Sequence, residues 1–490
     1  EALREVQARL RAGDDTLLVR TIDEPRKAFA DLDRGEPRPR HPGQQPARGR
    51  PHRGRPRTGR RMTAVPRPRM LLVAEAANPE WASVPLVGWS LASAIAARTD
   101  AHIVTQVRNR DAFLRAGMVE GRDFTAIDTE RLEKPLWRLA EAMSLGRKGG
   151  WTTLAAMTSL TYPYFERLVW KAFGDRIRSG EFDVVHRITP VSPTAVGPLA
   201  QRVHAAGVPF ILGPINGGVP WPKGFETTRR REREWLSSLR GIHKLRPARR
   251  RMLAACDVIL CGSNFALNEI PADLRHKAML FPENGIDPAR FRAVADQPGT
   301  LPLRACFIGR LVPLKGVAMA IEAAAPLLAD GRMRFDIIGD GSERAALEAQ
   351  VAAAGLGAAV TFHGWLEHRQ VQDVAAQSQM LLFPSIREFG GGAVLEAMAL
   401  GLVPVVVDYA GPGELVDDEV GFKVPMGQAA DIVAGLRALL DRIAADPSVL
   451  PPLGAAARAR VQRDFQWDAK AAQVIRIASS VASDQVHTVV

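Results

Sequence analysis

Residues 380–408 read MLLFPSIREFGGGAVLEAMALGLVPVVVD, and this stretch carries the pattern that decides the fold. Two apolar runs, MLLFPS (380–385) and VPVVVD (403–408), are typical of strands buried in a parallel sheet. Between them, AVLEAMALG (393–401) reads as the first turns of a helix, and three consecutive glycines precede it. Three glycines inside a helix would cost on the order of 1 kcal/mol each, so we place them in the turn before it. The stretch therefore predicts a strand–helix–strand unit of an α/β domain.

The same alternation runs along the chain from residue 70. The other predicted strands are MLLVAE (70–75), AHIVTQV (101–107), FDVVHRI (182–188), VPFILG (208–213), CDVILCG (256–262), LRACFIGR (303–310), RFDIIGDG (334–341) and VTFHG (360–364). Helical patterns separate them, among them WSLASAIAAR (89–98), VAMAIEAAAPLLAD (317–330) and SERAALEAQVAAAG (342–355). We predict two doubly wound, Rossmann-like domains facing each other across a cleft.

The turn-rich segment 281–299 has no such periodicity and is the predicted linker. It separates a first domain at 70–295 from a second at 300–464. The helix pattern FQWDAKAAQVIRIASSV (465–481) follows the completed second domain. We expect residues 465–490 to dock back across the cleft or to cover the sheet.

The net charge of +12 is concentrated at the N-terminus. Residues 1–69 hold 18 Lys and Arg against 9 Asp and Glu, so the rest of the chain carries only +3. Residues 37–69 contain 11 arginines and no acid, a composition that cannot bury enough apolar surface to fold. One interpretation of 1–69 is a disordered arm that touches RNA or anionic lipid by charge. The interpretation we favour is that the native chain starts at Met62 or Met70. The near-neutral body predicts no specific nucleic-acid partner.

The cysteines and the hydropathy pattern point to a cytoplasmic protein. Cys256, Cys261 and Cys306 form no CxxC pair and no metal spacing, which is typical of buried residues in a reducing compartment. Asp31-Leu32-Asp33 lies in the N-terminal segment, so we discount it as a metal-binding motif. No run approaches the roughly 20 apolar residues of a membrane span, and no signal-peptide pattern opens the sequence.

Three segments with chemistry follow strands of the second domain. Gly309 and Arg310 precede Lys315 in GRLVPLKG; Gly339 and Gly341 flank Asp340 after IIG; and Glu388 and Glu396 follow LLFPS. The carboxyl ends of parallel strands meet at one edge of a sheet, where ligands bind.

The ligand that suits this set is a diphosphate. Arg310 and Lys315 supply two cations, and the amides of Gly390, Gly391 and Gly392 at a helix N-terminus add an anion site. Glu396 could then accept hydrogen bonds from ribose hydroxyls, and Glu388 could reach the group beyond the phosphates. The alternative is a set of tight turns with solvated charges; the joint placement at strand ends favours the site.

GRLVPLKG, IIGDG, VTFHGWL and EFGGGAVLEAMALGLVPVV, in this order, resemble the retaining glycosyltransferases of family 4, which have the GT-B fold. The resemblance covers roughly residues 70–481, and its most specific part is the E-x7-E segment with EAMA-x-G behind it. It implies a nucleotide-sugar donor, transfer without metal or cofactor, and retained anomeric configuration. It also implies a glycan or lipid-linked acceptor in surface polysaccharide or glycolipid synthesis.

The resemblance assigns roles to individual residues. Arg310 and Lys315 match the pair that grips the donor diphosphate, and Glu388 matches the carboxylate that contacts the donor sugar. Glu396 matches the residue that holds the ribose, and Gly391 matches the glycine whose loop meets phosphate and sugar.

Three departures from the family pattern stand out. Phe389 follows Glu388 directly, and Gly390 takes the place usually held by Phe, so the loop is expected to be wider. Where many members carry His-x-His, this chain has His186-Arg187-Ile188, and His186 is either catalytic or structural. The glycine-rich loop after the first strand is replaced by EAANPEWASVPLVGW, with Gly88 as its only glycine.

The first domain offers candidates for the acceptor side. GPINGGVPWPKGF (213–225) follows a predicted strand and carries Gly217, Gly218, Trp221 and Lys223, a set that suits a sugar or a lipid-linked acceptor. The alternative is a structural Pro/Gly loop. The segment 229–251 has ten Lys and Arg against two Glu, so an anionic membrane surface or lipid diphosphate is one partner, and a solvated helix is the alternative.

Other functions on the same fold remain open from the sequence. A sugar-nucleotide epimerase would need no acceptor, and a phosphorylase would need a lysine that holds pyridoxal phosphate. A catalytically inactive scaffold would not need intact Glu388, Glu396, Arg310 and Lys315, which are all present.

Overall fold

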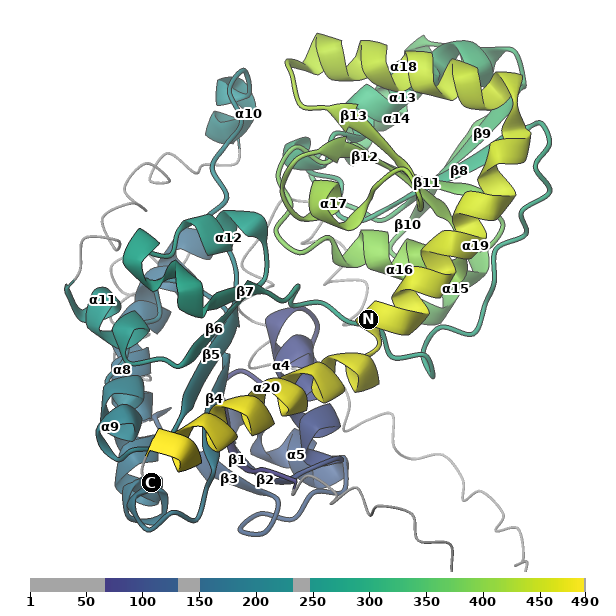
Figure 1. The fold of residues 1–490 in the computed structure, drawn as a ribbon. Helices are drawn as coiled ribbons and strands as arrows, with labels where there is room; N and C mark the ends of the chain where they lie inside the picture. The colour runs from purple at the N-terminus through teal and green to yellow at the C-terminus, as the bar shows by residue number, and fades with distance from the viewer. Residues whose placement is uncertain (1–66, 131–149, 232–246, 489–490) are drawn as a thin grey trace, which may run out of the picture. The chain divides into compact units, whose positions relative to one another are not determined.

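The computed structural model describes residues 67–130, 150–231 and 247–488, and within these ranges it contains two parallel sheets (Figure 1). The first has the strand order β3-β2-β1-β4-β5-β6-β7, and the second has the order β10-β9-β8-β11-β12-β13. Every paired strand is parallel to its neighbour, as the continuous apolar runs predicted. The prediction of two doubly wound α/β domains is therefore confirmed.

The strands of the first sheet are β1 Arg69–Ala74, β2 Asp100–Gln106, β3 Phe124–Ile127, β4 Val184–Thr189, β5 Phe210–Ile215, β6 Val258–Cys261 and β7 Ala278–Leu280. Those of the second are β8 Leu303–Ile308, β9 Met333–Ile338, β10 Val360–Gly364, β11 Met380–Phe383, β12 Val403–Asp408 and β13 Phe422–Pro425. All the predicted strands form, with shifts at their ends. The sequence reading missed β3, β7 and β13, which are three or four residues long.

Helices alternate with the strands along the chain and cover both faces of each sheet (Figure 1). The α-helices attached to the first sheet are α4 Val84–Ala96, α5 Arg110–Arg115, α8 Gly150–Arg178, α9 Leu199–Ala205, α10 Glu226–Arg231, α11 Pro247–Ala254 and α12 Asn264–Asn268. Those that follow are α13 Val317–Ala329, α14 Arg344–Ala353, α15 His368–Ala375, α16 Gly392–Leu400, α17 Ala410–Leu415, α18 Ala429–Ala445, α19 Leu450–Arg460 and α20 Trp467–Thr488. Short 3-10 or π segments include η4 Pro313–Lys315 and η6 Val461–Phe465.

The C-terminal helix α20 packs on the first sheet, although it follows the second in sequence. It runs beside α4 in Figure 1, and the two helices are in contact. Ala471, Val474 and Ala478 are fully buried in the cluster that contains Met70 and Leu72 of β1. Just before α20, the backbone N–H of Ile286 donates to Phe465 O at 2.7 Å, so the linker and the start of α20 run together.

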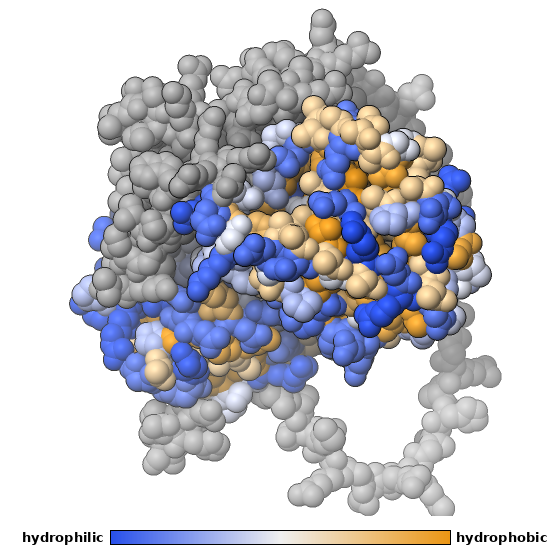
Figure 2. Space-filling model, turned by 90° about the horizontal axis from the view of Figure 1, so that it is seen from above, coloured by the Kyte–Doolittle hydropathy of each residue, from blue (hydrophilic) through white to orange (hydrophobic). Residues whose placement is uncertain are grey.

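The surface mixes hydrophilic and hydrophobic residues over the face shown in Figure 2. Among the described residues, no helix combines the length and the apolar character that a membrane crossing requires. The predictions for residues 1–66, and for the part of the basic segment at 232–246, fall outside the described residues.

Candidate functional site

The three glycine-containing segments follow adjacent strands of the second sheet. Strands β9, β8 and β11 are neighbours in that order, so their carboxyl ends lie at one edge. Gly309 and Gly339 have φ of +151° and +140°, which favours glycine. A Cβ on Gly339 would also overlap the carbonyl oxygen of Gly309. The two turns therefore approach each other more closely than any side chain would allow.

The turn that carries Lys315 is fixed against the segment that follows β11. The backbone N–H of Ile386 donates to Leu314 O at 3.0 Å, and Ser385 Oγ donates to the same oxygen at 3.2 Å. Gly316, with φ of +71°, ends η4 and begins α13. A Cβ there would overlap Pro384 O, so glycine is needed for both conformation and space.

This attachment brings Lys315 and Glu388 into a direct ion pair. Lys315 Nζ donates to Glu388 Oε2 and also lies 5.0 Å from the centre of the Phe383 ring. The Lys315 and Glu388 side chains are 13% and 23% exposed, so the pair is accessible to a ligand but partly shielded from water. Such a pair is stronger than one at the open surface, because screening by water is weaker.

The glycines of the donor loop (388–392) form the N-terminus of α16. Gly391 precedes the helix in the left-handed conformation, with φ of 60°, and Gly392 is its first residue. The backbone N–H groups at the start of a helix have no partner within the helix and attract anions. The N-cap of α16 is thus three residues after Glu388, as the sequence pattern predicted.

Glu396 lies one turn inside α16, with a carboxyl group enclosed by protein. Its residue surface is only partly exposed, and burial raises the pKa of Glu396 to about 7, while the charge of Arg290 acts to lower it. No group within the described ranges hydrogen-bonds to this carboxyl. An enclosed carboxyl without a protein partner is well suited to accept hydrogen bonds from a ligand.

Arg310 follows Gly309 at the same edge of the sheet. Its side chain is exposed, and no hydrogen bond or ion pair joins it to another residue of the described part of the chain. An unpaired guanidinium at this edge can bind phosphate oxygens in a bidentate manner.

The predicted acceptor-side loop (213–225) contacts the donor loop and its surroundings. Arg387 Nε donates to Val219 O at 3.0 Å, and its guanidinium carbon lies 5.0 Å from the Trp221 ring centre and 5.3 Å from that of Phe389. Tyr409 Oη donates to Pro220 O at 3.0 Å. Trp221 therefore stacks on an arginine of the second domain, a contact that the sequence did not reveal.

The rest of this loop has a mixed environment. Strand β5 continues through Gly213 and Pro214, beyond the predicted end of the strand. Gly217 and Gly218 have φ of +118° and +78°, which favours glycine, and Lys223 is exposed.

His186 lies in the middle of β4 and has no exposed surface. Its Nε2 is 2.7 Å from Gly213 O and therefore carries the proton, and its Nδ1 is buried without a hydrogen-bond partner. Burial lowers the pKa of His186 to about 4, so the ring is neutral near pH 7. This environment favours the structural alternative for His186.

Sequence reasoning missed Glu283 and Asn284 in the predicted linker. Asn284 Nδ2 donates to Gly390 O at 2.8 Å, and Asn216 Nδ2 donates to both carboxylate oxygens of Glu283 at 2.8 and 2.7 Å. Burial raises the pKa of Glu283 to about 7. Burial also lowers the pKa of Lys470, a residue of α20, to about 7. The only signal for them in the sequence was an acid and an amide within a turn-rich segment.

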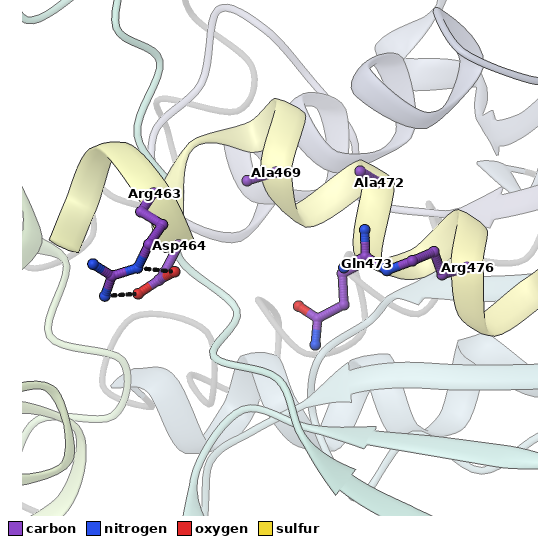
Figure 3. A pocket seen from close by; sticks show the side chains of 6 residues that line it. All are labelled: Arg463, Asp464, Ala469, Ala472, Gln473 and Arg476. Carbon is purple, nitrogen blue, oxygen red and sulfur yellow. Dashed lines mark hydrogen bonds and ion pairs between the residues drawn. The ribbon is translucent and has the colours of Figure 1, made fainter. Parts of the chain in front are cut away.

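A separate pocket of about 400 Å³ lies at the junction of η6 and α20 (Figure 3). It is lined by Arg463, Asp464, Ala469, Ala472, Gln473 and Arg476. Arg463 is already paired with Asp464 through hydrogen bonds of 2.9 and 2.7 Å. None of the predicted site residues lines this pocket. Within the described ranges, no group of three or more His, Cys, Asp or Glu residues could hold a metal ion.

Comparison with known proteins places this site in a family domain. Residues 298–444 match the family model described as Glycosyl transferases group 1. The amylovoran biosynthesis glycosyltransferase AmsK of Erwinia amylovora is 30% identical over 206 residues, which are 40% of this chain and 50% of that protein. The 2-deoxystreptamine glucosyltransferase of Streptomyces kanamyceticus is 38% identical over 141 residues, which are 28% of this chain and 35% of that one. The chain thus spans about half or less of the length of these curated relatives.

The likeness extends to both sheets in solved structures. The crystal structure of Anabaena HepE in complex with UDP superposes with a TM-score of 0.53 at 15% identity, covering 84% of this chain and 100% of that one. At this identity the likeness shows the fold, which is GT-B as predicted. The fold of the chain is therefore GT-B, and its residues 298–444 match the model of the glycosyl transferases group 1 family.

Proposed function

We propose that this protein is a retaining glycosyltransferase that moves a sugar from a nucleoside-diphosphate sugar to a hydroxyl of a glycan or lipid-linked acceptor. The observation that carries the proposal is the Lys315–Glu388 ion pair beside the N-terminus of α16. It joins a cation, a carboxylate and free backbone amides at the edge of a family domain. The relative named for amylovoran biosynthesis supports a role in surface polysaccharide or glycolipid synthesis.

Lys315, Arg310 and the donor-loop amides stabilise the leaving group in this proposal. As the bond between the sugar and the diphosphate breaks, negative charge grows on the phosphate oxygens. Fixed cations and amides that already point at that position stabilise the transition state more than the ground state. The exposed Arg310 guanidinium and the turns at Gly309, Gly339 and Gly341 belong to the same phosphate site.

Glu388 contacts the donor sugar in this proposal. Its carboxylate is held beside the phosphate site by Lys315, at the position where the sugar attached to the diphosphate would begin. It can accept hydrogen bonds from sugar hydroxyls and stabilise positive charge at the anomeric carbon. The acceptor hydroxyl attacks from the face that the diphosphate leaves, and a departing phosphate oxygen takes its proton. No protein nucleophile is required, and His186, which is fully buried, takes no part.

The nucleoside of the donor binds at Glu396 in this proposal. Its largely buried carboxyl, to which no side chain of the described ranges hydrogen-bonds, accepts hydrogen bonds from the ribose hydroxyls. The HepE complex contains UDP, so a UDP-sugar is the first donor to test. Gly217, Gly218, Trp221 and Lys223 contribute to the acceptor side through the loop that Arg387 and Tyr409 hold.

Calorimetric titration with UDP, GDP and ADP tests the phosphate site. Lys315→Ala is expected to weaken binding of the preferred nucleotide about tenfold or more, because it removes one of two cations. Arg304→Ala is the matched control: Arg304 is also an exposed arginine on β8, but near the start of the strand rather than after its end. Equal losses in the two variants would contradict the proposed phosphate site.

Incubation with a panel of nucleotide sugars, with and without simple glycan acceptors, tests the reaction. Transfer, or slow donor hydrolysis without an acceptor, is the expected result. An epimerised sugar nucleotide would instead show an epimerase, and absorbance of bound pyridoxal phosphate would show a phosphorylase. Nucleotide binding without any turnover across the panel would favour the inactive scaffold.

A further inference from the structure

The Glu283 carboxylate occupies a slot between the two domains' loops. The residue is 8% exposed, and Asn216 Nδ2 donates to both of its oxygens at 2.8 and 2.7 Å. Asn216 lies at the start of the acceptor-side loop, next to Gly217. The linker that the sequence predicted as a passive connection therefore contributes a buried carboxylate near the proposed site.

Two glycines form the walls of this slot. Gly262 follows β6 and Gly390 belongs to the donor loop, and neither has a φ in the left-handed region. Their requirement is space: a Cβ on either glycine would overlap a carboxylate oxygen of Glu283. A Cβ at 390 would also lie 2.7 Å from Glu283 Cδ, and one at 262 would lie 2.8 Å from Asn216 Cβ. The slot thus fits this carboxylate only while both positions lack a side chain.

The slot connects the acceptor-side loop with the donor loop. Asn216 Oδ1 accepts hydrogen bonds from the N–H of Gly217 at 2.8 Å and from Ser263 Oγ at 2.9 Å. On the other side, Asn284 Nδ2 donates to Gly390 O at 2.8 Å. Glu283 and Asn284 therefore fix Gly390 and Asn216 relative to each other through hydrogen bonds and close contact.

We propose that Glu283 is a positioning residue for sugar transfer, which sets the spacing between the donor loop at Gly390 and the acceptor-side loop at Asn216. This inference rests on the proposed function, because the spacing matters only if a donor sugar and an acceptor hydroxyl meet there. It also gives a physical reason for glycine at position 390. The Glu283 carboxylate fills the space into which a side chain at 390 would extend.

The carboxylate is better suited to this position than its amide. Both oxygens of Glu283 accept from one Asn216 N–H₂ group, so Glu283→Gln would turn one acceptor into a donor that faces another donor. Asn216→Ala removes the partner and leaves the carboxylate in place. Both variants therefore disrupt the hydrogen bonds between positions 216 and 283 and leave the slot filled.

A pair of substitutions tests the slot without any substrate. Gly390→Ala is expected to lower the melting temperature by about 3 °C or more in the wild-type background, because the new methyl group overlaps Glu283 Oε1 and Asn284 Nδ2. In the Glu283→Ala background the same substitution should cost less, because only the overlap with the Asn284 amide remains. Gly357→Ala is the control, since a Cβ there meets nothing within 4 Å and its φ is ordinary. An equal loss from Gly390→Ala in both backgrounds would overturn the proposal.

The proposal can still be tested if one of these variants does not fold. If Gly390→Ala fails to fold, the double variant must fold for the proposal to stand. If Glu283→Ala fails, hydrogen–deuterium exchange of Asn216→Ala decides. Faster exchange in the donor-loop peptide 386–396 is expected, although no hydrogen bond joins Asn216 to that peptide within the described ranges. A change confined to residues 213–225 and 262–266 would contradict the coupling.

The role in transfer has its own measurement. With a donor and an acceptor identified by the nucleotide-sugar panel, Asn216→Ala and Glu283→Gln should lower the ratio of transferred to hydrolysed sugar about tenfold, while UDP affinity stays within about threefold. An unchanged ratio would restrict Glu283 to a structural role and overturn the proposal. A wild-type protein that turns over no donor would refute the proposed function, and the melting-temperature experiment would still decide whether the slot exists.

Discussion

At the scale of single residues, the Lys315–Glu388 ion pair controls how the proposed phosphate site binds a nucleotide. Each charge is largely neutralised by the other, and both side chains remain partly exposed. A bound diphosphate would compete with Glu388 for the lysine. The two residues therefore have opposite expected effects on nucleotide binding, although both are expected to be essential for transfer.

Glu388→Gln is expected to abolish transfer while UDP binds at least as tightly as to the wild type. The neutral amide keeps the shape but no longer competes with the diphosphate for Lys315. Calorimetry with UDP and a transfer assay check the two parts. Glu322→Gln, an exposed acid on α13, is the control. Near-wild-type transfer by Glu388→Gln, or a loss of affinity like that of Lys315→Ala, would count against the assigned role.

Glu396 is expected to make the protein less stable as the pH rises. Burial raises its folded-state pKa to about 7, above the value of 4.5 for an unperturbed carboxyl. Between these values the unfolded chain loses the proton and the folded chain keeps it, so the folded state loses up to about 2–3 kcal/mol across the window. Glu396→Gln cannot ionise, and its melting temperature should exceed that of the wild type more at pH 8 than at pH 5.

The same variant should also lose nucleotide affinity, since an amide accepts fewer hydrogen bonds from ribose than a carboxylate does. A gain in stability together with a loss of binding is typical of a residue kept for function. A melting temperature of Glu396→Gln that tracks the wild type at both pH values would refute the burial argument.

Residue-level prediction succeeded where the chemistry follows strand ends. Lys315, Glu388 and the donor-loop glycines could be placed together because the carboxyl ends of neighbouring parallel strands share an edge. Glu283 could not be found in this way. Its partner Asn216 is 67 positions away, and its contact with Gly390 depends on the fold of both halves of the chain.

At the scale of elements, the docking of α20 on the first sheet is the contact that ties the end of the chain to its beginning. Val474 is fully buried in the cluster formed with β1, and Arg476, two residues on, is exposed. The helix thus presents an apolar side to the core of the first domain.

Val474→Asp is expected to destabilise the fold by about 3 kcal/mol or more, because it places an unpaired charge in an apolar core. Arg476→Asp, on the same helix, places the same carboxylate at the exposed surface and should have little effect. Thermal unfolding followed by circular dichroism compares them. Equal melting temperatures for the two variants would show that α20 does not pack as described.

Element prediction failed at the edges of the sheets. Strands β3 and β7 form the two ends of the first sheet, and β10 and β13 form those of the second. Of these, β3, β7 and β13 are only three or four residues long, and runs that short cannot be told from turns by periodicity alone. The long central runs were recognisable because both of their faces are buried.

At the scale of the whole molecule, the two α/β domains were predicted from the alternation of strands and helices, and the contacts between their loops were not. Arg387, Tyr409 and Asn284 join segments more than a hundred residues apart. Such pairings arise from tertiary packing and leave no local pattern in the sequence.

Proteins that begin at Met62 and at Met70 are expected to differ in melting temperature. Arg69 is the first residue of β1; its N–H donates to Asp183 at 2.7 Å, and its side chain pairs with the same acid at 2.6 Å. A protein that starts at Met70 lacks Arg69 and both of these contacts, so it should melt about 1–3 °C lower than one that starts at Met62. Equal melting temperatures for the two proteins would contradict this expectation.

The central claim is that a nucleoside diphosphate binds at the carboxyl edge of β8, β9 and β11, between two cations and the N-terminus of α16. A crystal structure of the protein soaked with UDP tests it most directly. We predict the diphosphate between Arg310, Lys315 and the amides of Gly390–Gly392, with the ribose at Glu396. UDP bound at any other place, such as the pocket beside α20, would contradict the account.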